Sequence, residues 1–212
     1  MLIAPVRGFV FLATTKTGST AIESAFGPYS QTVQRNSPRL KHTRYAKFER
    51  YLAPFLAANG WPRETYEVVC AFREPIDWLH SWWRYRSREE IADSSHRAHK
   101  NYTGNVSMEE FARAYINDTH QFARVGRQAQ MVQARPKQHA IDRIFRHERL
   151  DLLIEFLCEK VGEDVEVGYL NVSPEMPYEL SEECERELRE YLTGEYRIYE
   201  LIGPFKAVIP GS

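Results

Sequence analysis

The feature that most constrains the fold of this chain is a short apolar run near the N-terminus that stops at a polar, glycine-containing turn. Residues 8–14 form a continuous apolar run, which is typical of a strand buried on both faces of a parallel sheet. Residues 15–20 read TKTGST, and residues 19–26 then have helical spacing, with apolar side chains four positions apart. A buried strand that passes through a tight turn into a helix favours an α/β fold.

The rest of the chain continues this alternation. Residues 66–72 and 140–145 are further candidates for buried strands, whereas residues 29–42 lack periodicity and are predicted to be a loop. Helical spacing or capping residues predict further helices at residues 43–58, from Pro75, after the capping box at residues 107–110, at residues 150–161 and after Ser181. Strands that alternate with helices predict one α/β domain over residues 1–212, built around a mainly parallel sheet with helices on both faces.

Composition excludes several classes of protein. The net charge of the 212 residues is −1, so we expect no nucleic-acid partner. No apolar run approaches the roughly 18 residues of a membrane span, and the N-terminal run is better explained as a strand than as a signal peptide. The three cysteines are too few and too scattered for a disulfide framework or a CxxC metal site, and their odd number fits a reducing compartment. We therefore expect a cytoplasmic protein.

The turn after the first predicted strand has the composition of an anion-binding site. A helix N-terminus presents unpaired N–H groups and a partial positive charge, and Gly18 lets the backbone curl. Ser19 and Thr20 add hydroxyl groups, and Lys16 adds a full positive charge. Together they predict a cradle for phosphate or sulfate, although an ordinary turn with a surface lysine is the alternative. The turn is not a Walker A loop, in which the lysine follows the second glycine, because Lys16 precedes the only glycine of residues 15–20.

A second candidate half-site follows the next predicted strand. Arg73 stands at the carboxyl end of that strand, and Ser81 follows it by eight residues. Arginine suits bidentate phosphate binding, and the carboxyl ends of neighbouring strands face the ligand crevice of open α/β sheets. The alternative is that Arg73 pairs with Glu74 or Glu67 and that Ser81 is a small packing residue.

These two half-sites, in this order and spacing, resemble the sulfotransferases that use 3′-phosphoadenosine 5′-phosphosulfate (PAPS). The likeness extends over residues 8–200 and includes residues 145–150 and 170–174, which are similar to the carbohydrate-type and bacterial members. It implies a P-loop-like sheet in which the first turn binds the 5′-phosphosulfate. The residues that match this turn are Lys16, Thr17, Gly18, Ser19 and Thr20. The resemblance also implies that Arg73 and Ser81 bind the 3′-phosphate.

Two departures from the family pattern bear on the substrate. Cytosolic members that act on small molecules have a tryptophan after the two hydroxyl residues, where this chain has Ala21. They also carry a C-terminal Arg-Lys-Gly loop, for which residues 203–206 are a poor substitute. A glycan-like or other hydroxyl acceptor is therefore expected rather than a phenol or steroid, with loops such as residues 29–42 and 92–106 forming its pocket.

Sulfuryl transfer, like phosphoryl transfer, depends mainly on positioning and on stabilising charge. Lys16 is expected to neutralise charge on the bridging oxygen, and the scheme needs no metal. His42 is the candidate base, because histidine titrates near neutral pH and the family places its base after the first helix. Glu23 is the second candidate, but one turn inside a helix it is expected to face solvent.

Two other functions remain open from the sequence. A nucleotide-dependent kinase built on the same turn would need Mg·ATP and carboxylates that hold the metal, but Arg73 stands where such a carboxylate is expected. A non-catalytic module would bind adenosine 3′,5′-bisphosphate or another anion without turnover, and replacing His42 would then change affinity at most.

Overall fold

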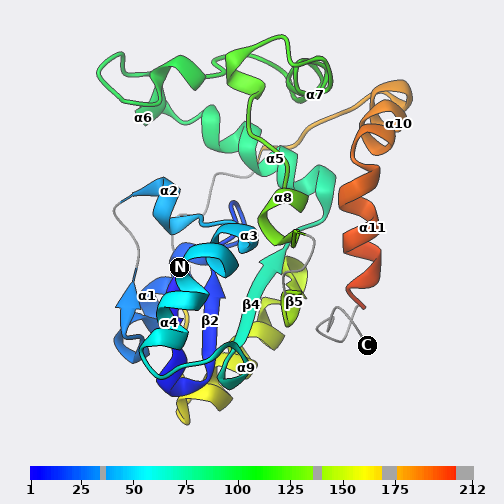
Figure 1. Cartoon of the computed structure of the whole chain (residues 1–212). Helices are drawn as coiled ribbons and strands as arrows, with labels where there is room; N and C mark the ends of the chain where they lie inside the picture. The colour runs from blue at the N-terminus through cyan, green and yellow to red at the C-terminus, as the bar shows by residue number, and fades with distance from the viewer. Residues whose placement is uncertain (34–36, 136–139, 169–175, 204–212) are drawn as a thin grey trace. The chain divides into compact units, whose positions relative to one another are not determined.

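The computed structural model describes residues 1–33, 37–135, 140–168 and 176–203, and it divides the chain into two compact units (Figure 1). The first unit comprises Met1–Arg73, Gln128–Asn171 and Ile198–Ser212, and the second comprises Glu74–Arg127 and Val172–Arg197. The expectation that residues 1–212 form a single domain stays a prediction.

The first unit is built on a five-stranded sheet with the order β3-β1-β2-β4-β5. Its strands are β1 (Leu2–Ala4), β2 (Phe9–Leu12), β3 (Thr32–Val33), β4 (Glu67–Phe72) and β5 (Arg143–Arg146). The β2/β4 and β4/β5 pairs are parallel, as expected for strands joined by helical crossovers, whereas β1 is antiparallel to both β2 and β3.

The sheet is therefore mixed, and the prediction of a mainly parallel sheet was wrong at one edge. The cause is β1, which has only three residues and therefore no readable period. A short 3₁₀ turn, Pro5–Arg7, ends at Gly8 with a φ of 75°, and it folds β1 back onto β2 as a hairpin. The predicted loop at residues 29–42 likewise contains the short strand β3 and the helical turn α2 (Pro38–Lys41).

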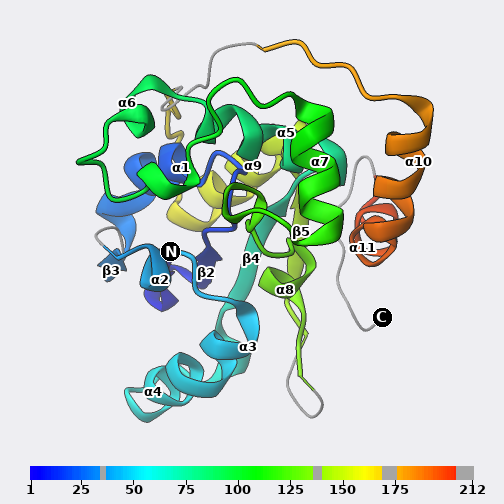
Figure 2. The same ribbon diagram turned by 90° about the horizontal axis from the view of Figure 1, so that it is seen from above.

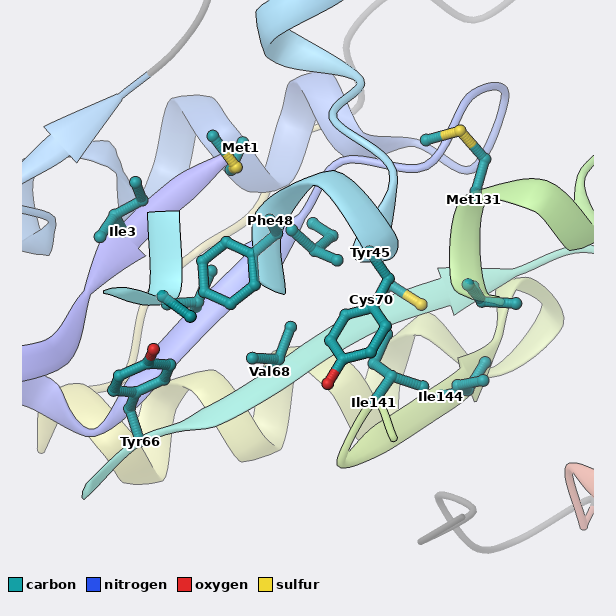
Figure 3. Close-up of a cluster of buried hydrophobic side chains, with 14 of the residues drawn as sticks. Met1, Ile3, Tyr45, Phe48, Tyr66, Val68, Cys70, Met131, Ile141 and Ile144 are labelled. Carbon is teal, nitrogen blue, oxygen red and sulfur yellow. The ribbon is translucent and has the colours of Figure 1, made fainter. Parts of the chain in front are cut away.

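Both faces of the sheet are buried, as the unbroken apolar runs predicted. One face packs through Phe9, Phe11 and Ala71 against α1 (Ser19–Phe26) and α9 (Leu150–Val161). The opposite face is covered by α3 (Tyr45–Lys47), α4 (Ala53–Ala58) and α8 (Ala129–Val132). Figure 3 shows this second core, with Tyr45 and Phe48 lying over Val68 and Cys70 of β4. Helices thus flank the sheet on both sides.

The predicted helix at residues 43–58 is present from residue 45, but it contains a π-helical stretch at Phe48–Leu52. Pro54 follows this stretch at the start of α4. Because proline has no N–H and its ring clashes with the preceding turn, a wider turn before it accommodates the chain without ending the helix.

The second unit is helical and has its own core. Its helices are α5 (Pro75–Arg86), α6 (Glu89–Ala92), α7 (Met108–Asn117) and α10 (Glu182–Tyr191), and α11 (Thr193–Leu201) begins in it. Helix α7 starts with the predicted capping box between Ser107 and Glu110, and it packs against α5 and α10 (Figure 2). Single 3₁₀ turns complete the described elements at Gly27–Tyr29, Arg63–Thr65, His99–Asn101, Gln121–Ala123 and His147–Arg149. Among the described residues, none of these helices has the length and apolarity that crossing a membrane requires.

Candidate anion-binding site

The turn between β2 and α1 has an unusual backbone. Gly18 adopts a left-handed conformation with a φ of 70°, and a Cβ placed on it would lie 3.2 Å from Cδ1 of Leu150. Lys16 also has a positive φ, of 61°, which is a strained conformation for a residue with a side chain. Strain of this kind persists where the surrounding structure holds it, and it is common at binding sites.

Two threonines hold the turn from inside. The Thr14 hydroxyl donates to the Ala71 carbonyl on β4 at 2.5 Å, and the Thr17 hydroxyl donates to the Thr14 carbonyl at 3.0 Å. The two hydroxyl oxygens lie 2.9 Å apart, and both residues are completely buried. Thr17, which the sequence marked as a ligand-binding residue, therefore uses its hydroxyl as scaffold, and its backbone N–H is the group that can face an anion.

The first turn of α1 is open to a ligand. Gly18 is the N-cap residue, and no side chain caps the helix. In the described part of the chain, no protein acceptor is recorded for the amides of Gly18, Ser19 or Thr20. Helix amides of this type carry partial positive charge, so the geometry suits an oxyanion.

Arg73 reaches this turn from the neighbouring strand tip. Its Nη1 donates to the Lys16 carbonyl at 3.1 Å, as the parallel pairing of β2 and β4 allows. The structure thus brings together two of the predicted site residues that lie 57 positions apart. The bond places the Arg73 guanidinium against the turn.

Gln128 fixes the backbone of Arg73, and sequence reasoning missed it. Its Oε1 accepts from the Arg73 N–H at 2.9 Å, and its Nε2 donates to the Arg73 carbonyl at 2.8 Å. The side chain is completely buried. A single glutamine before a short helix gives no local signal of this role, because the pairing depends on a contact across 55 positions.

Ser81, the other predicted ligand of the 3′-phosphate, lies on α5 in the second unit and is buried. Its pairing with Arg73 at one ligand stays a prediction. Residues 170–174, which also carried the family resemblance, lie outside the described residues, as do residues 204–206.

His42 lies directly beside the strand that leads into the turn. Its Nδ1 is 2.7 Å from the Ala13 carbonyl. Because a carbonyl only accepts, neutral His42 carries its proton on Nδ1, and the basic lone pair is on Nε2. Burial lowers the pKa of His42 below its usual 6.5, and the positive charge of Lys41 lowers it further, against opposing effects of the Ala13 carbonyl and Glu23. The imidazole is therefore neutral at pH 7.

The expectation that Glu23 faces solvent was wrong. Only 1% of its side chain is exposed, and its carboxylate contacts the N-terminal amine of Met1 and, at 3.0 Å, the Nζ of Lys41. The position of Glu23 in the sequence predicts that it is helical. It does not predict that two cations, the Met1 amine and Lys41, reach it from distant parts of the chain. Both contacts engage the Glu23 carboxylate inside the protein.

A third strand tip borders the same turn. His147 begins the 3₁₀ turn after β5, and its Cε1 lies 3.8 Å from the position that a Cβ on Gly18 would occupy. The tips of β2, β4 and β5 therefore supply residues to one place. The described residues contain no cluster of three or more metal-ligating side chains.

Comparison with known proteins adds no relative: no family model, curated protein or solved structure matches this chain. The assignment of a function therefore depends on the geometry of the site. That geometry can bind an oxyanion through backbone amides and cations, and it places a neutral imidazole nearby.

Proposed function

We propose that this protein is a PAPS-dependent sulfotransferase with a P-loop-like fold, and that the turn at residues 15–20 binds the 5′-phosphosulfate. The observation that carries this proposal is the Arg73 guanidinium bonded to the strained turn at the Lys16 carbonyl, beside the open N-terminus of α1. A phosphosulfate is an anhydride of two acids with several negative oxygens. The amides of residues 18–20 and the Lys16 ammonium match that demand, and the Arg73 guanidinium adds a second cation next to the turn.

Lys16 and His42 divide the chemistry of transfer. As the sulfur leaves the bridging oxygen for the acceptor oxygen, negative charge grows on the 5′-phosphate, and the Lys16 ammonium stabilises it. The acceptor hydroxyl gives its proton to Nε2 of His42, which becomes the imidazolium. The Ala13 carbonyl holds the Nδ1 proton and so fixes both the tautomer and the ring orientation.

Arg73 and Ser81 are proposed as ligands of the 3′-phosphate, on the family resemblance alone. If Arg73 binds the 3′-phosphate, its removal should weaken only those nucleotides that carry this phosphate. We expect Arg73→Ala to weaken adenosine 3′,5′-bisphosphate much more than AMP. Equal losses for the two nucleotides would assign Arg73 to the 5′ side of the ligand instead.

The acceptor is proposed to be a hydroxyl compound, of which a carbohydrate is one candidate. The departures at Ala21 and at the C-terminus support a substrate other than a small phenol. This site offers no recognisable stacking partner for adenine within residues 15–21, so adenine recognition is assigned to no residue.

A thermal-shift titration tests the proposal against a kinase and against a simple anion binder. The ligands are adenosine 3′,5′-bisphosphate, ATP and AMP, each with and without Mg²⁺. We expect the bisphosphate to stabilise most, by about 2.7 kcal/mol at one hundred times its dissociation constant, with no need for Mg²⁺. A shift with Mg·ATP alone would show a kinase-like site. Bisphosphate binding with no transfer of the sulfuryl group from PAPS to any of a panel of glycan acceptors would show a binding module.

A further inference from the structure

Lys41 contacts the anion-binding turn directly, although the proposed function gives it no role. Its Nζ lies 2.9 Å from Oγ1 of Thr20 and 3.0 Å from Oε2 of Glu23. The side chain is only 16% exposed, so its ammonium group is held beneath the start of α1 rather than in solvent. Lys41 also immediately precedes His42 at the end of α2.

The direction of these hydrogen bonds determines what Thr20 can do. An ammonium group only donates, so Oγ1 of Thr20 is the acceptor in its bond with Lys41. The Thr20 hydroxyl then keeps its own proton for another acceptor, and within the described residues no such acceptor is recorded for it. A hydroxyl oriented in this way has its proton available to donate to a ligand, which is what a phosphate or sulfate oxygen requires.

Glu23 keeps Lys41 in place. Its buried carboxylate fixes the ammonium on one side and contacts the Met1 amine on the other. Without the lysine, a buried negative charge would remain one helical turn from an anion site. Removal of Lys41 is therefore expected to weaken anion binding, because the Thr20 hydroxyl loses the donor that orients it.

We propose that Lys41 is a positioning residue of the anion site: held by Glu23, it orients the Thr20 hydroxyl as a donor to the bound anion and fixes the His42 segment against the turn. The proposal rests on the proposed function in one respect, namely that the anion is the phosphosulfate end of PAPS. The orientation of Thr20 applies to any oxyanion in the turn.

A double-mutant cycle tests this role. The variants are Lys41→Met, Thr20→Val and the pair, with Thr20→Ser and the exposed Lys47→Met as matched controls. Calorimetry gives the dissociation constant of adenosine 3′,5′-bisphosphate, at a temperature where each variant is folded by its melting curve. We expect each single change to weaken binding about tenfold, the value of one hydrogen bond to a charged group, and the pair to lose little more than either. Lys47→Met should stay within about twofold because it lies outside the contact, and Thr20→Ser, which keeps the hydroxyl, should bind more tightly than Thr20→Val.

Two results would overturn the proposal. Additive losses of about a hundredfold in the pair would show that Lys41 acts independently of Thr20, and binding by Lys41→Met within about twofold of wild type would show that it does not act at all. If Lys41→Met does not fold, Lys41→Gln replaces it, since a neutral amide can still donate to Thr20, and we expect it to bind at least threefold more tightly than Thr20→Val.

The same cycle separates this proposal from the proposed function. If wild-type protein does not bind adenosine 3′,5′-bisphosphate, the sulfotransferase proposal fails, and inorganic pyrophosphate becomes the probe. Non-additive losses for pyrophosphate would then support the role of Lys41. Absence of pyrophosphate binding, or additive losses, would overturn it.

Discussion

The two ends of the sheet in the first unit use their charges in opposite ways. At the amino end, Arg63 bonds the carboxylates of Glu49 and Asp142, each at 2.6 Å, and Asp142 also accepts from the Val68 amide. At the carboxyl end, Arg73 and His42 bond backbone carbonyls. The ion pairs of Arg63 offset charge within the fold, whereas the carbonyl bonds hold Arg73 and His42 beside the anion-binding turn. The first arrangement stabilises the fold, and the second is suited to an incoming anion.

The amino end repeats this pattern at a third acid. Glu67, at the start of β4, contacts both Arg143 and Lys160. Partial burial alone would raise the pKa of Glu67, but the bonds from these two cations overcome it and hold the pKa below its usual value. Its stabilising effect is present above the pKa of an unfolded glutamate and is lost as the pH falls through the lower folded pKa.

Replacement of Lys16 should have the largest effect on function. We expect Lys16→Ala to slow the release of adenosine 3′,5′-bisphosphate from PAPS by on the order of 10²–10³, because a transition-state contact is lost. Affinity for the bisphosphate should stay within about tenfold. Lys16→Gly is the matched variant, and it should be more stable than Lys16→Ala by about 1 kcal/mol, because glycine relieves the strain of the positive φ. Equal rates for wild type and Lys16→Ala would contradict the assignment.

The most direct contrast between the two ends is the pair Arg63→Met and Arg73→Met. Arg63→Met leaves two acids without their cation, so it should cost about 3 kcal/mol of unfolding free energy by urea denaturation, with bisphosphate affinity little changed in the folded protein. Arg73→Met should show the reverse: little loss of stability and a loss of affinity of about tenfold or more. The same losses of stability and affinity in both variants would show that Arg63 and Arg73 do not differ in role.

Gln128 should give an intermediate effect. Gln128→Leu leaves the N–H and C=O of Arg73 without their partners, which should cost about 2 kcal/mol of stability. Because Arg73 is then less well held, affinity for the bisphosphate should fall as well. Gln128→Glu keeps the acceptor for the Arg73 N–H and is expected to fall between Gln128→Leu and wild type. Affinity that is unchanged in Gln128→Leu would show that Arg73 does not need this support.

His42 should give the smallest effect, seen in the pH dependence of stability. Its folded pKa lies below the unfolded value of about 6.5, so the unfolded chain binds more protons in the window just below pH 6.5. The stability contributed by neutral His42 is present above this value and declines as the pH falls toward the folded pKa. Urea midpoints between pH 5 and 8 should show a shallower decline in His42→Asn, which can still donate to the Ala13 carbonyl. An identical pH profile in the two proteins would show that His42 is not held neutral.

Local patterns predicted the elements that carry the site, but not the contacts that complete it. Continuous apolar runs marked β2 and β4, and glycines marked the start of α1 and the end of α9, because these signals lie within a few residues. The short strand β1 has too few residues for a period. The burial of Glu23 and the pairing of Gln128 with Arg73 depend on groups that are distant along the chain, and no spacing rule reports them.

Hydrogen–deuterium exchange with saturating adenosine 3′,5′-bisphosphate shows whether the turn at residues 15–20 binds this ligand. We expect slower amide exchange in peptides covering residues 15–21, where the amides of α1 would gain an acceptor. Peptides covering residues 62–67 at the amino end should exchange at an unchanged rate. Protection at residues 62–67 or elsewhere, with none at residues 15–21, would contradict binding at this turn.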